Sequence, residues 1–226
     1  MSDFFREVDE EMRNERMRNL WRRFGVYIIG VIVLIVVGTA AYRGYLAWQE
    51  SQAAASGDRF LEAIRLTNDG DAAGAQRIMD ELAADGTGKY PMLAQFRSAA
   101  LLVKEAKNAE AVAAYDALSK DGAVPTDLQD FATLQAGLAA VDVESFDAVK
   151  SRLGGLVLEE NPWRNLAREA LALSAWRAKQ VDEAARLVAE VLAEQNTPQG
   201  LRPRIQILRD LIISSGGTLP DVSDSG

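Results

Sequence analysis

An uninterrupted apolar run near the N-terminus is the first feature of the hydrophobic pattern. Residues 24–42 read FGVYIIGVIVLIVVGTAAY and include no charged side chain. At about 1.5 Å rise per residue, a helix of these 19 residues reaches roughly the thickness of a bilayer's hydrocarbon core. The run is too long for a strand, and a buried core helix is the alternative interpretation. The pattern therefore predicts a transmembrane helix over residues 24–42.

The rest of the chain alternates amphipathic helices with short polar breaks. Four prolines each stand before or inside the first turn of an apolar-periodic stretch, where the missing N–H has no helical partner. They are Pro91, Pro125, Pro162 and Pro198, separated by 34, 37 and 36 residues. A two-helix period of this length indicates a tetratricopeptide-type unit. We predict an all-α fold in which one N-terminal transmembrane helix precedes a tetratricopeptide-like α-solenoid. The solenoid would have about four helical hairpins, beginning near residues 47, 91, 125 and 162, and a terminal capping helix over about 198–214.

A small–large–large pattern repeats in the second helix of each unit. Its members are Ala75, Met79 and Leu82; Ala111, Tyr115 and Leu118; Phe146, Val149 and Leu153; and Ala184, Val188 and Val191. Twelve residues before each first member lie Ala63, Ala99, Leu134 and Ala172. The small residues allow two helices to approach closely, and the larger ones fill the space between successive hairpins.

Arginines flank the apolar run mainly on its N-terminal side. Arg16, Arg18, Arg22 and Arg23 precede the run, whereas only Arg43 follows closely. Because positive flanks stay cytoplasmic, the N-terminus is expected inside and the large domain outside. A cleaved signal peptide is the alternative, with a small-residue site at 38–41. The length of the apolar run and of the preceding polar segment favours an uncleaved anchor.

These features divide the chain into four parts. We expect a cytoplasmic juxtamembrane helix over 1–23, a transmembrane helix over 24–42, a periplasmic tetratricopeptide-like domain over 43–215 and a disordered Gly-, Ser- and Asp-rich tail over 216–226. Residues 1–23 contain six basic and six acidic residues, so the net charge of −8 belongs to the remainder. The exported part is therefore the acidic part.

Composition excludes several function classes. The chain has no Cys and no His, so it lacks a thiol nucleophile, an imidazole base and an ordinary zinc or haem site. The acidic carboxylate pairs, such as Glu159–Glu160, fall in predicted loops, where water keeps them ionised. A pI near 4.8 argues against nucleic-acid binding. We therefore expect a protein that is not an enzyme and that takes no cofactor, metal or small-molecule substrate.

Seven residues on or beside the predicted first helices are candidates for partner binding, because such helices usually line the surface that receives a peptide. They are Phe96, Arg97, Phe131, Gln135, Trp163, Arg164 and Trp176. The alternative for the aromatic residues is packing between hairpins, and for the arginines it is solvation or pairing with acidic neighbours. No pattern of Lys and Asn typical of a clamp for C-terminal carboxylates is present.

The N-terminal sequence carries a family resemblance. Residues 2–11 read SDFFREVDEE, and an Arg-rich stretch, Trp21 and Phe24-Gly25 lead into the apolar run. With this opening and the repeat layout, the chain resembles the ancillary SecYEG translocon subunit family (YfgM-like). That resemblance implies a bacterial inner-membrane protein whose periplasmic domain contacts Sec translocon subunits, periplasmic chaperones or exported client proteins.

The repeats also resemble those of an envelope cell-division coordinator. That family usually has a cleaved signal and a trimerising coiled coil, and neither is evident here. The function expected is a membrane-anchored adaptor at the Sec translocon, and the alternative is an envelope scaffold for cell division or outer-membrane assembly.

Overall fold

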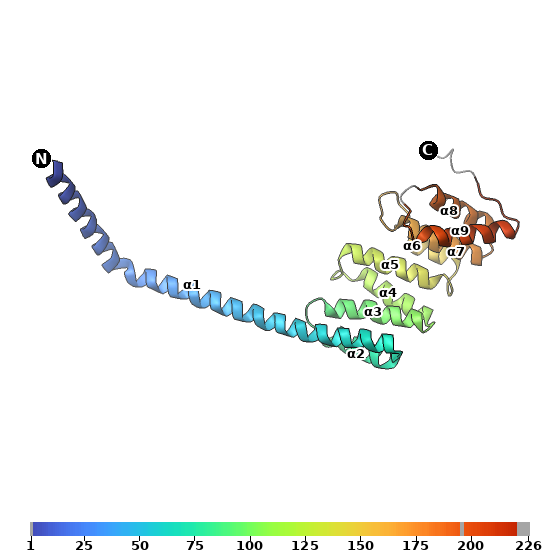
Figure 1. The fold of residues 1–226 in the computed structure, drawn as a ribbon, viewed down its shortest axis with the longest axis horizontal. Coiled ribbons are helices and arrows are strands. Elements are labelled where there is room, and N and C mark those ends of the chain that lie inside the picture. The colour runs from blue at the N-terminus through green and yellow to red at the C-terminus, as the bar shows by residue number, and fades with distance from the viewer. Residues whose placement is uncertain (1, 195–196, 221–226) are drawn as a thin grey trace. The chain divides into compact units, whose positions relative to one another are not determined.

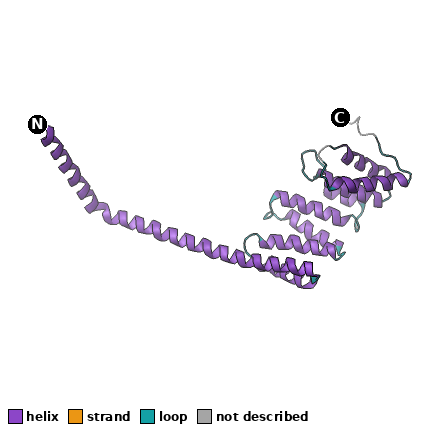
Figure 2. Cartoon of the chain, in the orientation of Figure 1, coloured by secondary structure: helices purple, strands orange, loops and turns teal. Residues whose placement is uncertain are grey.

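The computed structural model describes the backbone of residues 2–194 and 197–220, and the side chains of residues 21–194 and 197–220. Every regular element in these ranges is an α-helix (Figure 2). The helices are α1 (Ser2–Asp69), α2 (Ala72–Asp85), α3 (Tyr90–Lys104), α4 (Asn108–Lys120), α5 (Thr126–Ala140), α6 (Phe146–Leu153), α7 (Arg164–Arg177), α8 (Val181–Ala193) and α9 (Leu201–Ser214). The chain divides into two compact units, Met1–Ala55 and Ser56–Gly226. The all-α class predicted from the sequence is confirmed.

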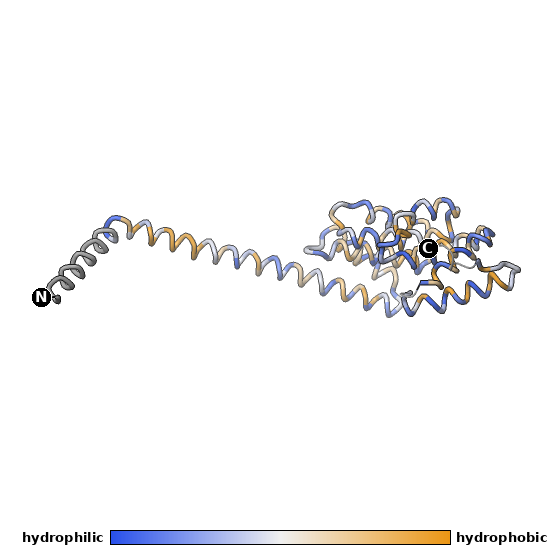
Figure 3. Tube along the Cα trace, turned by 90° about the horizontal axis from the view of Figure 1, so that it is seen from above, coloured by the Kyte–Doolittle hydropathy of each residue, from blue (hydrophilic) through white to orange (hydrophobic). Residues whose placement is uncertain are grey.

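The apolar run forms part of α1, and its large side chains are exposed along its length. Between Val26 and Val37 the large apolar side chains are 42% to 80% exposed, and the trace of this segment is coloured mostly hydrophobic in Figure 3. Such a large exposed apolar surface is rare in a soluble protein. Within the described ranges, α1 alone is long and apolar enough to cross a membrane. The run is therefore not a buried core helix, and its properties fit a single-pass membrane anchor or a signal sequence.

Aromatic side chains stand at both ends of this run. Trp21 precedes it and Phe24 begins it, and Tyr42, Tyr45 and Trp48 end or follow it, all of them exposed. The rings of Tyr45 and Trp48 lie 6.2 Å apart. Trp and Tyr are enriched where a membrane helix meets the two polar interfaces of the bilayer. This placement is typical of a helix that crosses the membrane.

The second unit is a stack of four hairpins, shown in Figure 1. The end of α1, from Ser56 on, pairs with α2, and the following pairs are α3 with α4, α5 with α6, and α7 with α8. Helix α9 packs on α8 and α7 and covers the last hairpin. The predicted solenoid of about four hairpins and a capping helix is confirmed.

Two predicted helix boundaries differ from those observed. No separate helix begins near residue 47, because α1 continues without a break to Asp69. The capping helix begins at Leu201 rather than at Pro198, which places Pro203 in its first turn. Proline is tolerated there because the first N–H groups of a helix have no intrahelical acceptor.

The residues of the repeated pattern form the core of the stack. The four residues Ala63, Ala99, Leu134 and Ala172 are each at most 2% exposed. The twelve residues of the small–large–large pattern are all buried as well, with Phe146 the most exposed at 6%. These side chains make up three buried clusters that follow one another along the stack. The helix crossings therefore fall where the sequence spacing predicts them.

Three of the four hairpins turn in the same way. Gly70, Ala106 and Lys179 have φ of +88°, +58° and +59°, and each directly follows or lies close behind the first helix of its hairpin. The N–H of the next residue donates to a carbonyl five positions back, with N–O distances of 2.9 Å in all three turns. This is the Schellman arrangement, in which a left-handed residue ends a helix.

The third hairpin departs from this scheme. Its second helix, α6, has only eight residues and is capped at its N-terminus by Ser145, whose Oγ accepts a hydrogen bond from the N–H of Ala148 at 3.3 Å. Gly137 of α5 allows α6 to come close, because a Cβ at that position would lie 2.5 Å from Leu153 Cδ2. An irregular segment, 154–163, then leads to α7. The third hairpin thus has a shorter second helix, and its two helices approach closely at Gly137.

Candidate functional site

A groove of about 350 Å³ runs across the first helices of the first three hairpins. It is lined by Phe60 of α1, by Leu93, Phe96, Arg97, Ala100 and Val103 of α3, by Tyr115 of α4, and by Phe131 and Gln135 of α5. Leu93 and Val103 are 39% and 41% exposed, so apolar surface is open to solvent there. Most of this lining is apolar or aromatic, as is common in sites that bind peptide side chains.

The aromatic side chains of the groove recur at one repeat position. Phe60, Phe96 and Phe131 each lie three residues before the buried residue that marks the helix crossing. The ring centroids of Phe96 and Phe131 are 5.9 Å apart, and those of Phe131 and Trp163 are 5.5 Å apart. Phe60 contacts Tyr90 at 6.0 Å. We call these five residues the aromatic row. All five are partly buried, so they contribute to packing between hairpins, and Phe60, Phe96 and Phe131 also present ring surface to the groove.

Arg97 is the single charged residue among those that line the groove in the described part of the chain. Its Nε is buried and has no hydrogen-bond partner, and Arg97 forms no ion pair with any described residue. Burial raises the pKa of the Tyr115 hydroxyl, and the positive charge of Arg97 opposes part of that rise. A cation therefore sits among aromatic rings without a carboxylate beside it.

Several other arginines of the repeat domain form ion pairs with glutamates of the same chain. Arg164 and Arg168 both reach Glu194, at 2.6 and 3.2 Å, and Arg204 forms two 2.6 Å hydrogen bonds with Glu169. Buried polar groups are normally satisfied, so an unpaired buried guanidinium nitrogen needs an explanation. Of these four arginines, Arg97 is the one whose position best suits binding of an acidic group from a partner protein.

The structure brings four of the seven candidate residues together. Phe96, Arg97, Phe131 and Gln135 line the one groove. Trp163 continues the aromatic row by its contact with Phe131. Their role in binding remains a prediction that their shared location supports.

The two remaining candidates lie elsewhere. The guanidinium of Arg164 pairs with Glu194 and donates to the carbonyl of Glu159 at 2.9 Å. Trp176 packs against the C-terminal buried cluster. Of the four arginines expected to set the topology, Arg22 and Arg23 are exposed. The side chains of Arg16 and Arg18 lie outside the described residues, as do residues 221–226 of the expected tail.

The aromatic row stops in the fourth hairpin. The repeat position occupied by phenylalanine in the first three hairpins is occupied there by Glu169, which is only 5% exposed. Arg204 of α9 reaches this carboxylate, so α9 covers that position of α7. The groove is therefore confined to the first three hairpins, and the capping helix covers the corresponding surface of the fourth.

Sequence reasoning missed Phe60 and Tyr115 as groove residues. Phe60 could have been found from the repeat offset alone, because it precedes Ala63 as Phe96 precedes Ala99. Tyr115 is 3% exposed and belongs to the buried pattern of the second helices, so the pattern assigns it to the core. Only the fold shows that one side of its ring also borders the groove.

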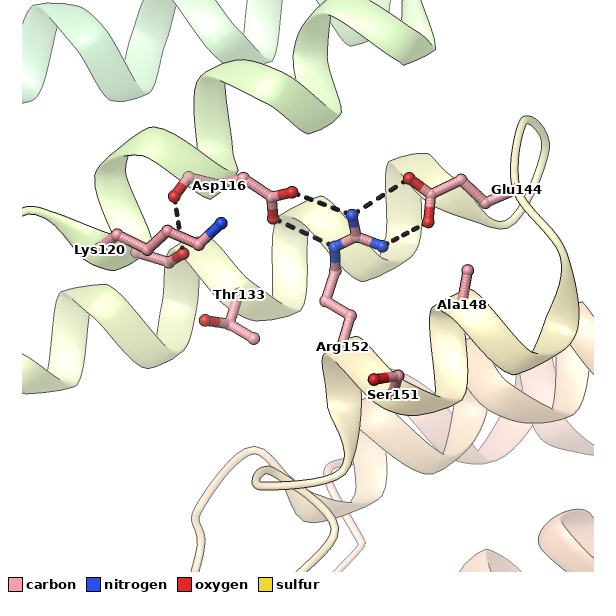
Figure 4. Close-up of a pocket in the computed structure, with 8 residues that line it drawn as sticks. Asp116, Lys120, Thr133, Glu144, Ala148, Ser151 and Arg152 are labelled. Carbon is pink, nitrogen blue, oxygen red and sulfur yellow. Dashed lines mark hydrogen bonds and ion pairs between the residues drawn. The ribbon is translucent and has the colours of Figure 1, made fainter.

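A second hollow, of about 600 Å³, lies on the opposite side of α5 and is shown in Figure 4. In its wall Arg152 of α6 points between Asp116 and Glu144 and donates two hydrogen bonds to each carboxylate, at 3.1 and 2.9 Å and at 2.5 and 3.1 Å. The hydrogen bonds that Arg152 donates to Asp116, and then those to Glu144, raise the pKa of Arg152 above its ordinary value. These charges satisfy one another, so this hollow is better explained as an ionic link between hairpins than as a binding site.

Comparison with known protein families assigns the repeat domain to a family. A family model described as a tetratricopeptide repeat-like domain matches residues 18–153, more than half of the chain. The chain belongs to this tetratricopeptide repeat-like family. The match includes the apolar run and extends through α6, so it covers every residue of the groove. Neither a curated protein nor a solved structure matches the chain. Tetratricopeptide repeat-like domains are typically non-catalytic modules for protein–protein interaction, so membership of this family indicates protein partners.

Proposed function

We propose that this tetratricopeptide repeat-like protein is an adaptor anchored in the bacterial inner membrane beside the Sec translocon. In this proposal α1 crosses the membrane once, the N-terminus is cytoplasmic and the repeat domain is periplasmic. The domain links exported proteins to periplasmic chaperones by binding them in the groove. The observation that supports the proposal most directly is the open apolar groove with its aromatic row. The same chain carries an exposed apolar helix that is long enough to cross a membrane. Anchoring would raise the local concentration of the groove at the translocon exit.

The orientation rests on the charges at the two ends of the apolar run. Arg22 and Arg23 directly precede it, and Arg43 is the only basic residue near its other end. The chain has no cysteine, so single reporters can be introduced without a background signal. We expect Ser214→Cys to react with a membrane-impermeant thiol reagent on intact spheroplasts and Ser2→Cys to react only after the membrane is permeabilised. The reverse labelling would contradict the proposed topology, and a shortened mature chain would indicate a cleaved signal peptide.

The partners can be tested by affinity purification of the tagged full chain from gently solubilised inner membranes, followed by mass spectrometry. We expect translocon subunits together with chaperones or exported proteins. The double variant Phe96→Ala/Phe131→Ala should lose most of the chaperones and exported proteins, because truncation removes the ring surface of the groove. The control variant Ile207→Ala/Leu211→Ala removes exposed apolar side chains of α9 and should retain them.

The phenylalanines also pack between hairpins, so a second measurement leaves them in place. A photoreactive residue at Leu93, 39% exposed in the groove, should cross-link the same partners, and one at Ile207 should not. Replacement of the apolar run by an unrelated span should remove translocon subunits if the contact lies in the bilayer. Co-purification of division or outer-membrane assembly proteins instead would favour the envelope scaffold. Equal cross-linking at both positions would show that the groove is not the binding surface.

A further inference from the structure

The chemistry of the groove narrows the kind of segment that it can bind. Its walls are aromatic and aliphatic, which suits apolar side chains of a partner. Gln135 adds one amide that can donate to and accept from a peptide backbone. Apolar walls alone do not select among hydrophobic segments, so any selection must come from the charged group, Arg97.

From this groove we infer that the partner segment carries an Asp or Glu side chain between apolar residues, and that Arg97 binds this carboxylate. This inference rests on the proposed function and adds the chemistry of the bound segment. A guanidinium presents a planar fork of donors that matches a carboxylate. Its buried Nε has no acceptor among the described residues, and no acidic residue lines the groove. A carboxylate from the partner would supply the missing acceptor and the opposite charge.

The position of Arg97 favours a side-chain carboxylate over the end of a peptide chain. Along α3 the groove continues on both sides of Arg97, toward Leu93 in one direction and toward Ala100 and Val103 in the other. A segment bound through an internal acidic residue can use both directions, whereas a C-terminal carboxylate would use only one. Recognition of a chain end also commonly employs several backbone or side-chain donors, whereas the one charged donor group among the described residues that line this groove is the guanidinium of Arg97.

The unpaired state of Arg97 gives an independent signature of a binding role. A cation held for stability contributes by pairing within the protein, and its removal leaves a partner unsatisfied. Arg97 has no such partner among the described residues, and the burial of its Nε without an acceptor is unfavourable. We therefore expect Arg97→Gln to keep or to raise the melting temperature of the repeat domain while it lowers binding of the acidic segment.

The test uses the purified full chain in detergent and pools of short capped peptides with random apolar residues around one fixed central residue. The central residue is Glu, Gln or Lys, and a fourth pool has central Gln and an uncapped C-terminal carboxylate. We expect the wild-type protein to retain the Glu pool about tenfold more than the Gln pool, and the Lys pool least. In Arg97→Gln the preference for Glu over Gln should fall to about twofold or less. Arg77→Gln, which removes an equal charge from an exposed position on α2, should keep the preference.

The inference would be overturned if the wild-type protein retained the Glu and Gln pools equally, or if it retained no pool. It would also be overturned if Arg97→Gln kept the preference for Glu over Gln. Preference for the uncapped pool would show that the groove binds chain ends instead. Suppose that co-purification of partners from the membrane still depends on Phe96 and Phe131 although Glu and Gln peptides bind equally. In that case the assignment of a carboxylate to Arg97 fails and the adaptor proposal stands. If that dependence is absent as well, both fail.

Discussion

Replacement of Gly137 by leucine is expected to lower the free energy of unfolding of the repeat domain by about 3 kcal/mol. Even the first atom of a side chain at this position would lie 2.5 Å from Leu153 Cδ2 and 2.7 Å from its Cγ. Leu153 is completely buried and surrounded by the C-terminal core cluster, so it has no space into which to move. Accommodating leucine requires α5 and α6 to separate, which opens the crossing of the third hairpin.

Chemical denaturation of the full chain in detergent, followed by circular dichroism, measures this effect. Gly122→Leu is the matched control, because no atom lies within 4 Å of a Cβ at that position, and it should leave the midpoint nearly unchanged. The double variant Gly137→Leu/Leu153→Ala should recover part of the loss, since the second change removes the atoms in conflict. An unchanged midpoint in Gly137→Leu would show that α5 and α6 do not cross at Gly137.

Arg152→Ala is expected to cost about 2–3 kcal/mol of unfolding free energy. The guanidinium is 16% exposed and lies between Asp116 and Glu144, each 28% exposed, so its removal leaves two partly buried carboxylates facing each other. The bonds connect α6 to α4 and to Glu144 in the loop between α5 and α6, and thus join the second and third hairpins. Lysine at this position keeps the charge but cannot form both pairs of hydrogen bonds, so Arg152→Lys should be intermediate.

Arg177→Ala serves as the control for the loss of an arginine. Its ion pair with Asp142 is more than half exposed on both sides, and such pairs contribute little, about 0.5 kcal/mol or less. The same denaturation measurement compares the two variants. A loss for Arg152→Ala no larger than that for Arg177→Ala would mean that the ionic link in Figure 4 does not stabilise the stack.

The sequence predicts the fold well because the repeat is marked by residues that act locally. Proline limits the position of helix starts, and small residues such as Ala99 and Ala111 are needed wherever two helices cross closely. The same reasoning misplaces the start of the first repeat helix. Nothing in the sequence near residue 47 would end a helix, so the period alone suggested a boundary there that the backbone does not have.

The candidate site was predictable only in part, because binding residues are distinguished by what lies beside them in space. Arg97 and Arg164 both belong to the first helix of a hairpin, and the sequence does not show which of them is paired. In the fold, Arg164 meets Glu194, which follows the end of α8 thirty residues later, while no carboxylate of the described residues forms an ion pair with Arg97. The ionic link of Arg152 to Asp116, 36 residues away, has the same origin. Such pairings depend on the register between hairpins, which the helix pattern does not specify residue by residue.

The left-handed turns of the hairpins show how the internal copies of this repeat have diverged. Three turns share one backbone conformation, yet the residue that adopts it is glycine once, alanine once and lysine once. Non-glycine residues adopt this conformation at a cost of about 1 kcal/mol. A repeat can therefore lose the characteristic residue of its turn while the turn keeps its geometry, as in these three hairpins. The relation among the three units is still evident in their torsion angles, although the residues at this position differ.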